Sequence, residues 1–176
     1  MKGVFMERTD LITVLRTLDE KASRIIPLGN KIVLTIAGGS ALILGGHIKR
    51  STTDIDILDN YPELQSLFGK YDVNNRINAY ADSLAENYED RLVKFDLETK
   101  AIDYYLLSLE DIVIMKLFSN RTKDYKDIRE KDVINNLNWE LLDKIISSGE
   151  ADISFNQTRY KQFLERYEEY KKEFSK

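Results

Sequence analysis

Two aspartates separated by one isoleucine, in the stretch DIDIL at residues 54–58, are the side chains in this sequence best suited to chemistry. Residues two apart in a strand project from the same face, so Asp54 and Asp56 converge while Ile55 and Ile57 point into the core. Converging carboxylates repel each other unless a cation neutralises them, and their hard oxygens suit Mg²⁺ or Mn²⁺. The spacing predicts a divalent cation site. The alternative is two solvated acids at the end of an edge strand.

A glycine pair upstream of these aspartates could bind phosphate. Gly38, Gly39 and Ser40 follow the apolar run KIVLTIA and precede ALIL, which is the pattern of a strand, a turn and a short helix. Glycines permit positive φ angles and close approach of a ligand to the backbone. Free amides at a helix start favour an anion, and the Ser40 hydroxyl would add a donor. The alternative is a tight turn before a core helix.

The elements that position these residues follow from the hydrophobic pattern. The pattern predicts an α/β (α+β) fold, in which a small mixed β-sheet is flanked by helices and followed by a helical C-terminal segment. We expect one domain over residues 1–176, with the sheet-containing core at about 1–107 and the helical segment at about 108–176. The expected strands are 31–37, 54–58, 92–97 and 102–107, the last two forming a hairpin, and the expected helices are 8–23, 108–118, 123–137, 139–146 and 158–174.

Composition narrows the possible functions. The chain has 176 residues, 43% hydrophobic and 32% charged, which is globular rather than disordered composition. It has no cysteine and one histidine, His47, which excludes thiolate chemistry and multi-histidine metal sites. A net charge of −4 argues against a general nucleic-acid coat protein. No signal peptide and no apolar run of about 20 residues is evident, which predicts a cytoplasmic protein without membrane contact.

A lysine interrupts the apolar stripe of the helix expected at 108–118. Lys116 shares a helical face with Leu109, Ile112, Val113 and Leu117, and Ser108 is placed to cap the helix start. The ammonium could snorkel to the surface. Otherwise it reaches a phosphate or a carboxylate, and it then belongs to the functional site.

The stretch GGSALIL followed by RSTTDID resembles the nucleotide-binding signature of the DNA polymerase beta-like nucleotidyltransferase superfamily. The spacing from Arg50 to Asp56 resembles its bacterial abortive-infection branch, which is related to the AbiEii-type toxins. The resemblance implies a nucleotidyltransferase fold, magnesium on the two aspartates, and a nucleoside triphosphate held by Gly38, Gly39, Ser40 and Arg50. A guanidinium fork suits phosphate oxygens. The alternative for Arg50 is a solvated loop charge.

A second block, residues 107–128, supports the same branch. In the family a lysine is followed by an arginine and a Lys-Asp-x-x-Asp pattern, which here matches Lys116, Arg121, Lys123, Asp124 and Asp127. The resemblance implies catalytic roles for Lys116 and Asp127. Many members of the superfamily carry a third carboxylate on a neighbouring strand. Asp96 is the preferred candidate here, with Asp103 and Asp127 as rivals.

The function implied by the resemblance is magnesium-dependent transfer of a nucleoside monophosphate from a nucleoside triphosphate to an RNA, such as tRNA, or to a protein hydroxyl. The resemblance also implies a toxin role, with a cognate antitoxin as partner. The alternative is a catalytically inactive nucleotide-binding or partner-binding protein with the same fold.

An aromatic stripe lies in the last expected helix. Its members are Tyr160, Phe163, Leu164, Tyr167 and Phe174. Such a stripe is typical of core packing or of a homodimer contact, and the alternative is a surface that stacks bases.

Overall fold

The computed structural model describes residues 3–75, 81–152 and 156–175. By contacts within the chain, the protein divides into two compact units. Unit 1 comprises Met1–Asn78 and Leu92–Leu107, and unit 2 comprises Ala79–Arg91 and Ser108–Lys176. The single-domain organisation stays a prediction.

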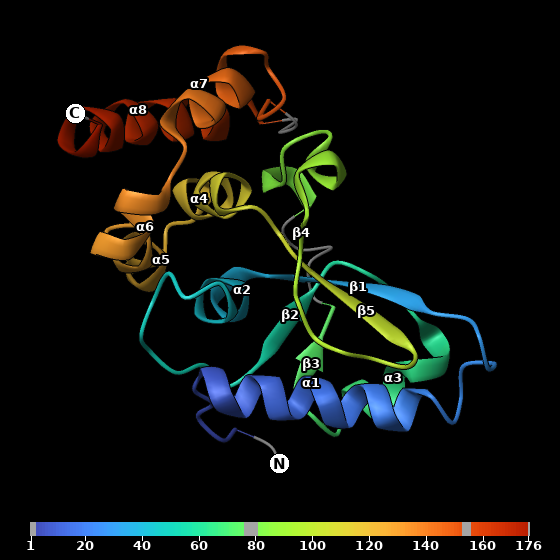
Figure 1. The fold of residues 1–176 in the computed structure, drawn as a ribbon. Coiled ribbons are helices and arrows are strands. Elements are labelled where there is room, and N and C mark those ends of the chain that lie inside the picture. Colours follow the sequence, from blue (N-terminus) through green and yellow to red (C-terminus); the bar gives the residue numbers. More distant parts are fainter. Residues whose placement is uncertain (1–2, 76–80, 153–155, 176) are drawn as a thin grey trace. The chain divides into compact units, whose positions relative to one another are not determined.

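Unit 1 contains a five-stranded mixed sheet with the strand order β3-β2-β1-β5-β4. β1 is parallel to β5 and antiparallel to β2, β2 is parallel to β3, and β4 is antiparallel to β5. The mixed sheet and the β4–β5 hairpin are confirmed (Figure 1). The strand β3 was not predicted. The strands are β1 (Ile32–Ala37), β2 (Ile55–Ile57), β3 (Val73–Asn74), β4 (Val93–Lys94) and β5 (Ile102–Leu106).

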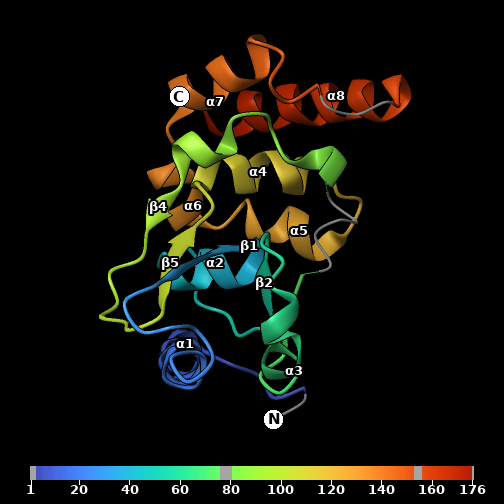
Figure 2. The same ribbon diagram turned by 90° about the vertical axis from the view of Figure 1, so that its right-hand side faces the viewer.

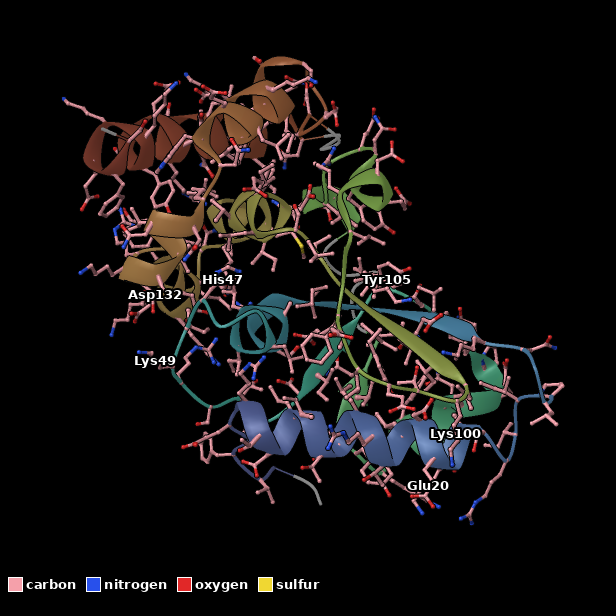
Figure 3. The ribbon with its side chains drawn as sticks, viewed as in Figure 1. Glu20, His47, Lys49, Lys100, Tyr105 and Asp132 are labelled. Atoms are coloured by element: carbon pink, nitrogen blue, oxygen red, sulfur yellow. The ribbon has the colours of Figure 1, made fainter. Side chains whose placement is uncertain are left out.

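Helix α1 (Arg8–Ala22) runs along this sheet (Figure 1). Its apolar residues recur at helical spacing, and Leu11, Leu15 and Leu18 are fully buried. The Asp19 carboxylate accepts hydrogen bonds from three successive backbone amides at residues 100–102, at 2.8, 2.8 and 2.9 Å. Figure 3 shows Lys100 beside the end of α1 that carries Glu20. A buried carboxylate thus fixes the start of β5 to the first helix.

Helix α2 (Gly38–Leu44) begins directly where β1 ends, as predicted. Its apolar residues are buried from Ala41 to Leu44, so the helix serves as core on that side. The chain then passes through His47 and Lys49, which Figure 3 labels, and returns as β2 beside β1. A short helical segment, η1 (Pro62–Leu64) and α3 (Gln65–Phe68), leads to β3.

Unit 2 is helical and is organised around α4 (Leu109–Phe118). α4 contacts α5, α7 and α8, and Figure 2 shows α7 and α8 above it. Ser108 caps α4 as predicted, because its hydroxyl oxygen accepts the Asp111 amide at 3.1 Å. The remaining elements are η3 (Ala81–Ser83), η4 (Tyr88–Arg91), α5 (Thr122–Asp127), α6 (Lys131–Asn136), α7 (Trp139–Ser147) and α8 (Gln157–Phe174).

The single helix predicted over 123–137 is wrong, because α5 and α6 are separated by a break before Glu130, whose backbone is extended. Ile128 and Val133 are both fully buried. Five residues apart on a continuous helix, they would face directions about 140° apart. The break allows both side chains to enter the core.

The aromatic stripe of α8 packs inside unit 2. Phe163 is fully buried and stacks on Phe118, with ring centroids 4.1 Å apart, and Tyr167 is also buried. The core-packing interpretation is therefore confirmed for these two residues. Among the described helices, none combines the length and apolar character needed to cross a bilayer.

Candidate functional site

Asp54 and Asp56 lie at the start of β2. The predicted alternation of buried isoleucines and more exposed aspartates is confirmed there. Ile55 and Ile57 are fully buried, whereas the two aspartates are half-buried. In the β1–β2 pairing Asp56 is opposite Ala37, the last residue of β1. The strand pair therefore brings the carboxylates to the point where the chain leaves β1 and enters α2.

The orientation of Asp54 is set by two neutral side chains. The Thr52 hydroxyl donates to Asp54 Oδ1 at 3.2 Å, and the Asn74 amide donates to Asp54 Oδ2 at 3.3 Å. Thr52 is itself fixed by two backbone hydrogen bonds with Met6, at 2.7 and 3.0 Å. Asn74 is on β3, opposite Asp56 in the register. Both oxygens of one carboxylate are thus held from different segments.

The junction between β1 and α2 favours glycine at position 38. Its φ is +62°, in the left-handed region that favours glycine. A Cβ at this position would also lie 3.0 Å from Asp56 Oδ2, a contact tighter than ordinary van der Waals packing. The backbone of the turn and the Asp56 carboxylate are therefore close neighbours.

Gly39 leaves room for a guanidinium. A Cβ at Gly39 would lie 2.6 Å from Arg50 Nη2 and 3.4 Å from Arg50 Cζ. Arg50 is half-buried, and its Nη1 donates to the Ser51 carbonyl at 2.9 Å. The structure thus places Asp56 and Arg50 beside consecutive glycines of the same turn, all within unit 1.

Ser40 is buried, and its hydroxyl donates to the Ala37 carbonyl at 3.0 Å. That hydrogen bond closes the turn between β1 and α2. The hydroxyl hydrogen is therefore already used within the turn, in the hydrogen bond to Ala37. Donation to a ligand requires rotation about the Cβ–Oγ bond.

The third carboxylate was not correctly predicted from the strands. Asp103 is opposite Val33, four residues from Ala37 along β1, or about 13 Å. It is bound by Lys31 at 3.0 Å. Asp96 follows Phe95, whose amide donates to the Tyr104 carbonyl, so Asp96 also lies at that end of the sheet and is exposed. Within the described residues there is no cluster of three or more carboxylate, histidine or cysteine side chains that could hold a metal ion. The preference for Asp96 is therefore wrong.

In unit 2, Lys116 is buried between two carboxylates of α5. Its Nζ lies 2.5 Å from Asp124 Oδ1 and 2.8 Å from Asp127 Oδ2. Lys116 is 5% exposed, and the two aspartates are 2% and 3% exposed. The ammonium does not snorkel to the surface, so that alternative is wrong. Lys116 and Asp127, for which the resemblance implies catalytic roles, are in direct contact.

Asp124 is the most heavily bound member of this cluster. Its Oδ2 also accepts from the Ser119 hydroxyl at 2.7 Å and from Arg121 Nε at 2.5 Å. Burial by itself raises the pKa of Asp124, but the Lys116 charge and the three hydrogen-bond donors outweigh it, so that the pKa lies below its ordinary value. Asp124 therefore remains ionised at neutral pH and balances the buried ammonium.

Sequence reasoning missed two residues of the carboxylate site, Thr52 and Asn74. Thr52 lies inside the RSTTDID stretch, and its spacing of two residues from Asp54 was a usable signal. Asn74 had no such signal, because a two-residue strand such as β3 is too short to show any periodicity.

The chain was compared with known proteins. A family model described as a nucleotidyltransferase of unknown function (DUF6036) matches residues 13–175. Neither the curated proteins nor the solved structures give a match. The family match covers α2, both β2 carboxylates, Arg50 and the Lys116 cluster. The chain therefore belongs to this family of nucleotidyltransferase enzymes.

Proposed function

We propose that the protein transfers a nucleoside monophosphate from a nucleoside triphosphate to a hydroxyl group, with Mg²⁺ or Mn²⁺ bound to Asp54 and Asp56. The observation that carries this proposal is the contact of Asp56, one of two carboxylates on the same face of β2, with the Gly38 turn, where Asp56 Oδ2 lies 3.0 Å from the position of a Gly38 Cβ. Nucleotidyl transfer needs acidic ligands and a phosphate-binding backbone side by side.

The donor set fits a hard divalent cation. Two carboxylates are the number that Mg²⁺ commonly takes from a protein when substrate phosphates complete its coordination. A bound cation would neutralise charge on the triphosphate and lower the pKa of the attacking hydroxyl. Thr52 and Asn74 hold Asp54 in place for this role, and the backbone from Gly38 to Ser40 binds the phosphates together with Arg50.

The chemical step follows from these roles. The acceptor hydroxyl oxygen bonds to the α-phosphorus, the bond to the bridging oxygen of the β-phosphate breaks, and pyrophosphate leaves. The hydroxyl proton passes to solvent. The Arg50 guanidinium stabilises negative charge on the phosphates.

We also propose catalytic roles for Lys116 and Asp127, which lie in unit 2. These roles are supported by the buried ion cluster of unit 2, in which the Lys116 ammonium contacts Asp124 at 2.5 Å and Asp127 at 2.8 Å. A buried ion cluster is a weak source of stability. Clusters of this kind with a perturbed pKa, as at Asp124, occur preferentially in functional sites.

The acceptor, the toxin role and the partners rest on the resemblance to the abortive-infection branch. We propose an RNA such as tRNA, or a protein hydroxyl, as the acceptor, and a cognate antitoxin as the partner. A homodimer is a further proposal, for which the partly exposed residues Tyr160, Leu164 and Phe174 on α8 are the candidate contacts.

Transfer can be tested by incubating the protein with each of the four nucleoside triphosphates, labelled at the α-phosphate, with Mg²⁺ or Mn²⁺ and either total RNA or total protein. We expect covalent label on one acceptor class and release of pyrophosphate. Omission of the cation is expected to remove the signal. Nucleotide binding without label transfer under any combination would instead support the inactive, nucleotide-binding alternative.

The contact between Gly39 and Arg50 gives a second prediction. Gly39→Ala is expected to displace the guanidinium, because the added Cβ would lie 2.6 Å from Arg50 Nη2. The flexible arginine can move aside, so thermal stability should change by less than about 1 kcal/mol. Nucleotide affinity should fall about as much as in Arg50→Ala. Isothermal titration calorimetry with the preferred triphosphate measures the affinity of each of these two variants.

Gly69→Ala is the matched control. Gly69 has a φ of −63°, and an added Cβ would make only an ordinary 3.5 Å contact with a backbone oxygen. This variant should bind nucleotide like the wild type. If Gly39→Ala bound nucleotide as tightly as Gly69→Ala, Arg50 would have no part in phosphate binding.

A further inference from the structure

Asn74 stands next to both carboxylates of the proposed cation site. It is opposite Asp56 in the parallel β2–β3 pairing, and its Nδ2 donates to Asp54 Oδ2 at 3.3 Å. Paired residues on neighbouring strands project from the same face, as do Asp54 and Asp56. The three side chains therefore form one polar group at the edge of the sheet.

The neutral charge of Asn74 determines how strongly this group attracts a cation. A carboxylate at the same place would add a third negative charge, and each added charge strengthens cation binding over a few ångströms. Mg²⁺ also gives up its water reluctantly. Two carboxylates with an amide donor between strands are thus a weak cation site until the phosphates of a nucleotide supply further oxygen ligands.

We propose that Asn74 is a positioning residue that makes cation binding depend on the nucleotide. Its amide holds Asp54 in the cation-free protein, and its lack of charge keeps the empty pair from capturing an ion alone. The cation then enters together with the triphosphate. This inference rests on the proposed function, because it concerns the same two carboxylates.

The test measures protein-bound Mn²⁺ from the electron paramagnetic resonance signal of free Mn²⁺, with Mn²⁺ alone and with Mn²⁺ plus each of the four nucleoside triphosphates. Each reading is taken relative to a matched sample without protein, because a triphosphate itself binds Mn²⁺. For the wild type we expect weak binding of Mn²⁺ alone and a gain of at least about tenfold with one of the nucleotides. Asn74→Asp should bind Mn²⁺ alone at least about tenfold more tightly than the wild type.

Asn75→Asp is the matched control, because it adds the same charge one residue along the chain. Asn75 follows the end of β3, and its Nδ2 donates to Asn60 Oδ1 at 3.1 Å. It should bind Mn²⁺ like the wild type. Asn74→Ala, which removes the amide without adding charge, should leave binding of Mn²⁺ alone weak and reduce the gain that the nucleotide gives. This variant tests the inference even if Asn74→Asp does not fold.

The outcomes separate the inference from the proposed function. If Asn74→Asp binds Mn²⁺ no more tightly than Asn75→Asp, while the wild type still gains Mn²⁺ with a nucleotide, the role of Asn74 is overturned and the cation site stands. An Asn74→Ala protein with the full nucleotide-dependent gain overturns it equally. If the wild type gains no Mn²⁺ with any of the four nucleotides, both the inference and the proposed site are overturned.

Discussion

Replacing Asp56 with asparagine is expected to reduce nucleotidyl transfer by on the order of a hundredfold or more, because a charged ligand at a phosphoryl centre is lost. The same change should also remove the rise in melting temperature that Mg²⁺ and a nucleoside triphosphate give the wild type by binding to the folded state. Without ligands, the melting temperature should stay level or rise, since one of two repelling carboxylates has gone. Initial rates of label transfer and thermal melting measure these effects.

Asp103→Asn is the control for this experiment. Asp103 is a carboxylate of the same sheet, bound by Lys31 and about four residues away along the strand direction. Its removal should leave transfer and the ligand-induced rise in melting temperature unchanged. Equal losses in the two variants, or none in Asp56→Asn, would contradict a cation site on β2.

Replacing Lys116 with methionine is expected to destabilise the protein by about 3–5 kcal/mol, as the removal of one partner from a buried ion pair does. On an apolar helical stripe, the same volume-conserving change would cost less than about 1.5 kcal/mol. The difference arises because Asp124 and Asp127, both almost fully buried, would lose the ammonium that they share. Urea unfolding gives the free energy.

Lys123→Met provides the matched control, because Lys123 is an exposed lysine of α5 and its replacement should change stability by less than about 0.5 kcal/mol. The double variant Lys116→Met with Asp124→Asn should recover part of the loss, since it removes a buried charge that no longer has a partner. A Lys116→Met protein as stable as Lys123→Met would show that the ion cluster does not form.

Predictions that depended on local periodicity succeeded around β1, α2 and β2, although the single helix predicted over 123–137 failed. The alternation around Asp54 and Asp56 placed two isoleucines in the core and two carboxylates outside it, because the side-chain period of a strand is built into neighbouring residues. The junction between β1 and α2 at Gly38 could likewise be predicted from the sequence, because a strand, a glycine pair and a short apolar helix follow one another directly in the chain.

Predictions that depended on pairing between distant segments failed or were incomplete. Asn74 reaches Asp54 only through the β2–β3 register, and Asp96 was preferred because nothing in its sequence reveals that it lies at the other end of the sheet. Lys116 was recognised as unusual from its helical face. The contribution of Asp124 became clear only with α5 in place, because the extended backbone at Ser119 and Arg121 separates α5 from α4 and lets Asp124 face Lys116.

The order of the two units along the chain affects how the protein folds during synthesis and which fragments of it can be produced. Unit 1 is completed by residues 92–107, which follow a stretch of unit 2, and Arg91 at the end of that stretch binds Asp111 with two hydrogen bonds of 2.8 and 2.9 Å. A ribosome therefore releases the edge of β1 well before β5 exists to pair with it, and an unpaired strand edge invites association with other chains. No single cut yields both units intact, so a fragment ending before residue 92 lacks two strands, and one beginning at residue 108 lacks the arginine that Asp111 binds.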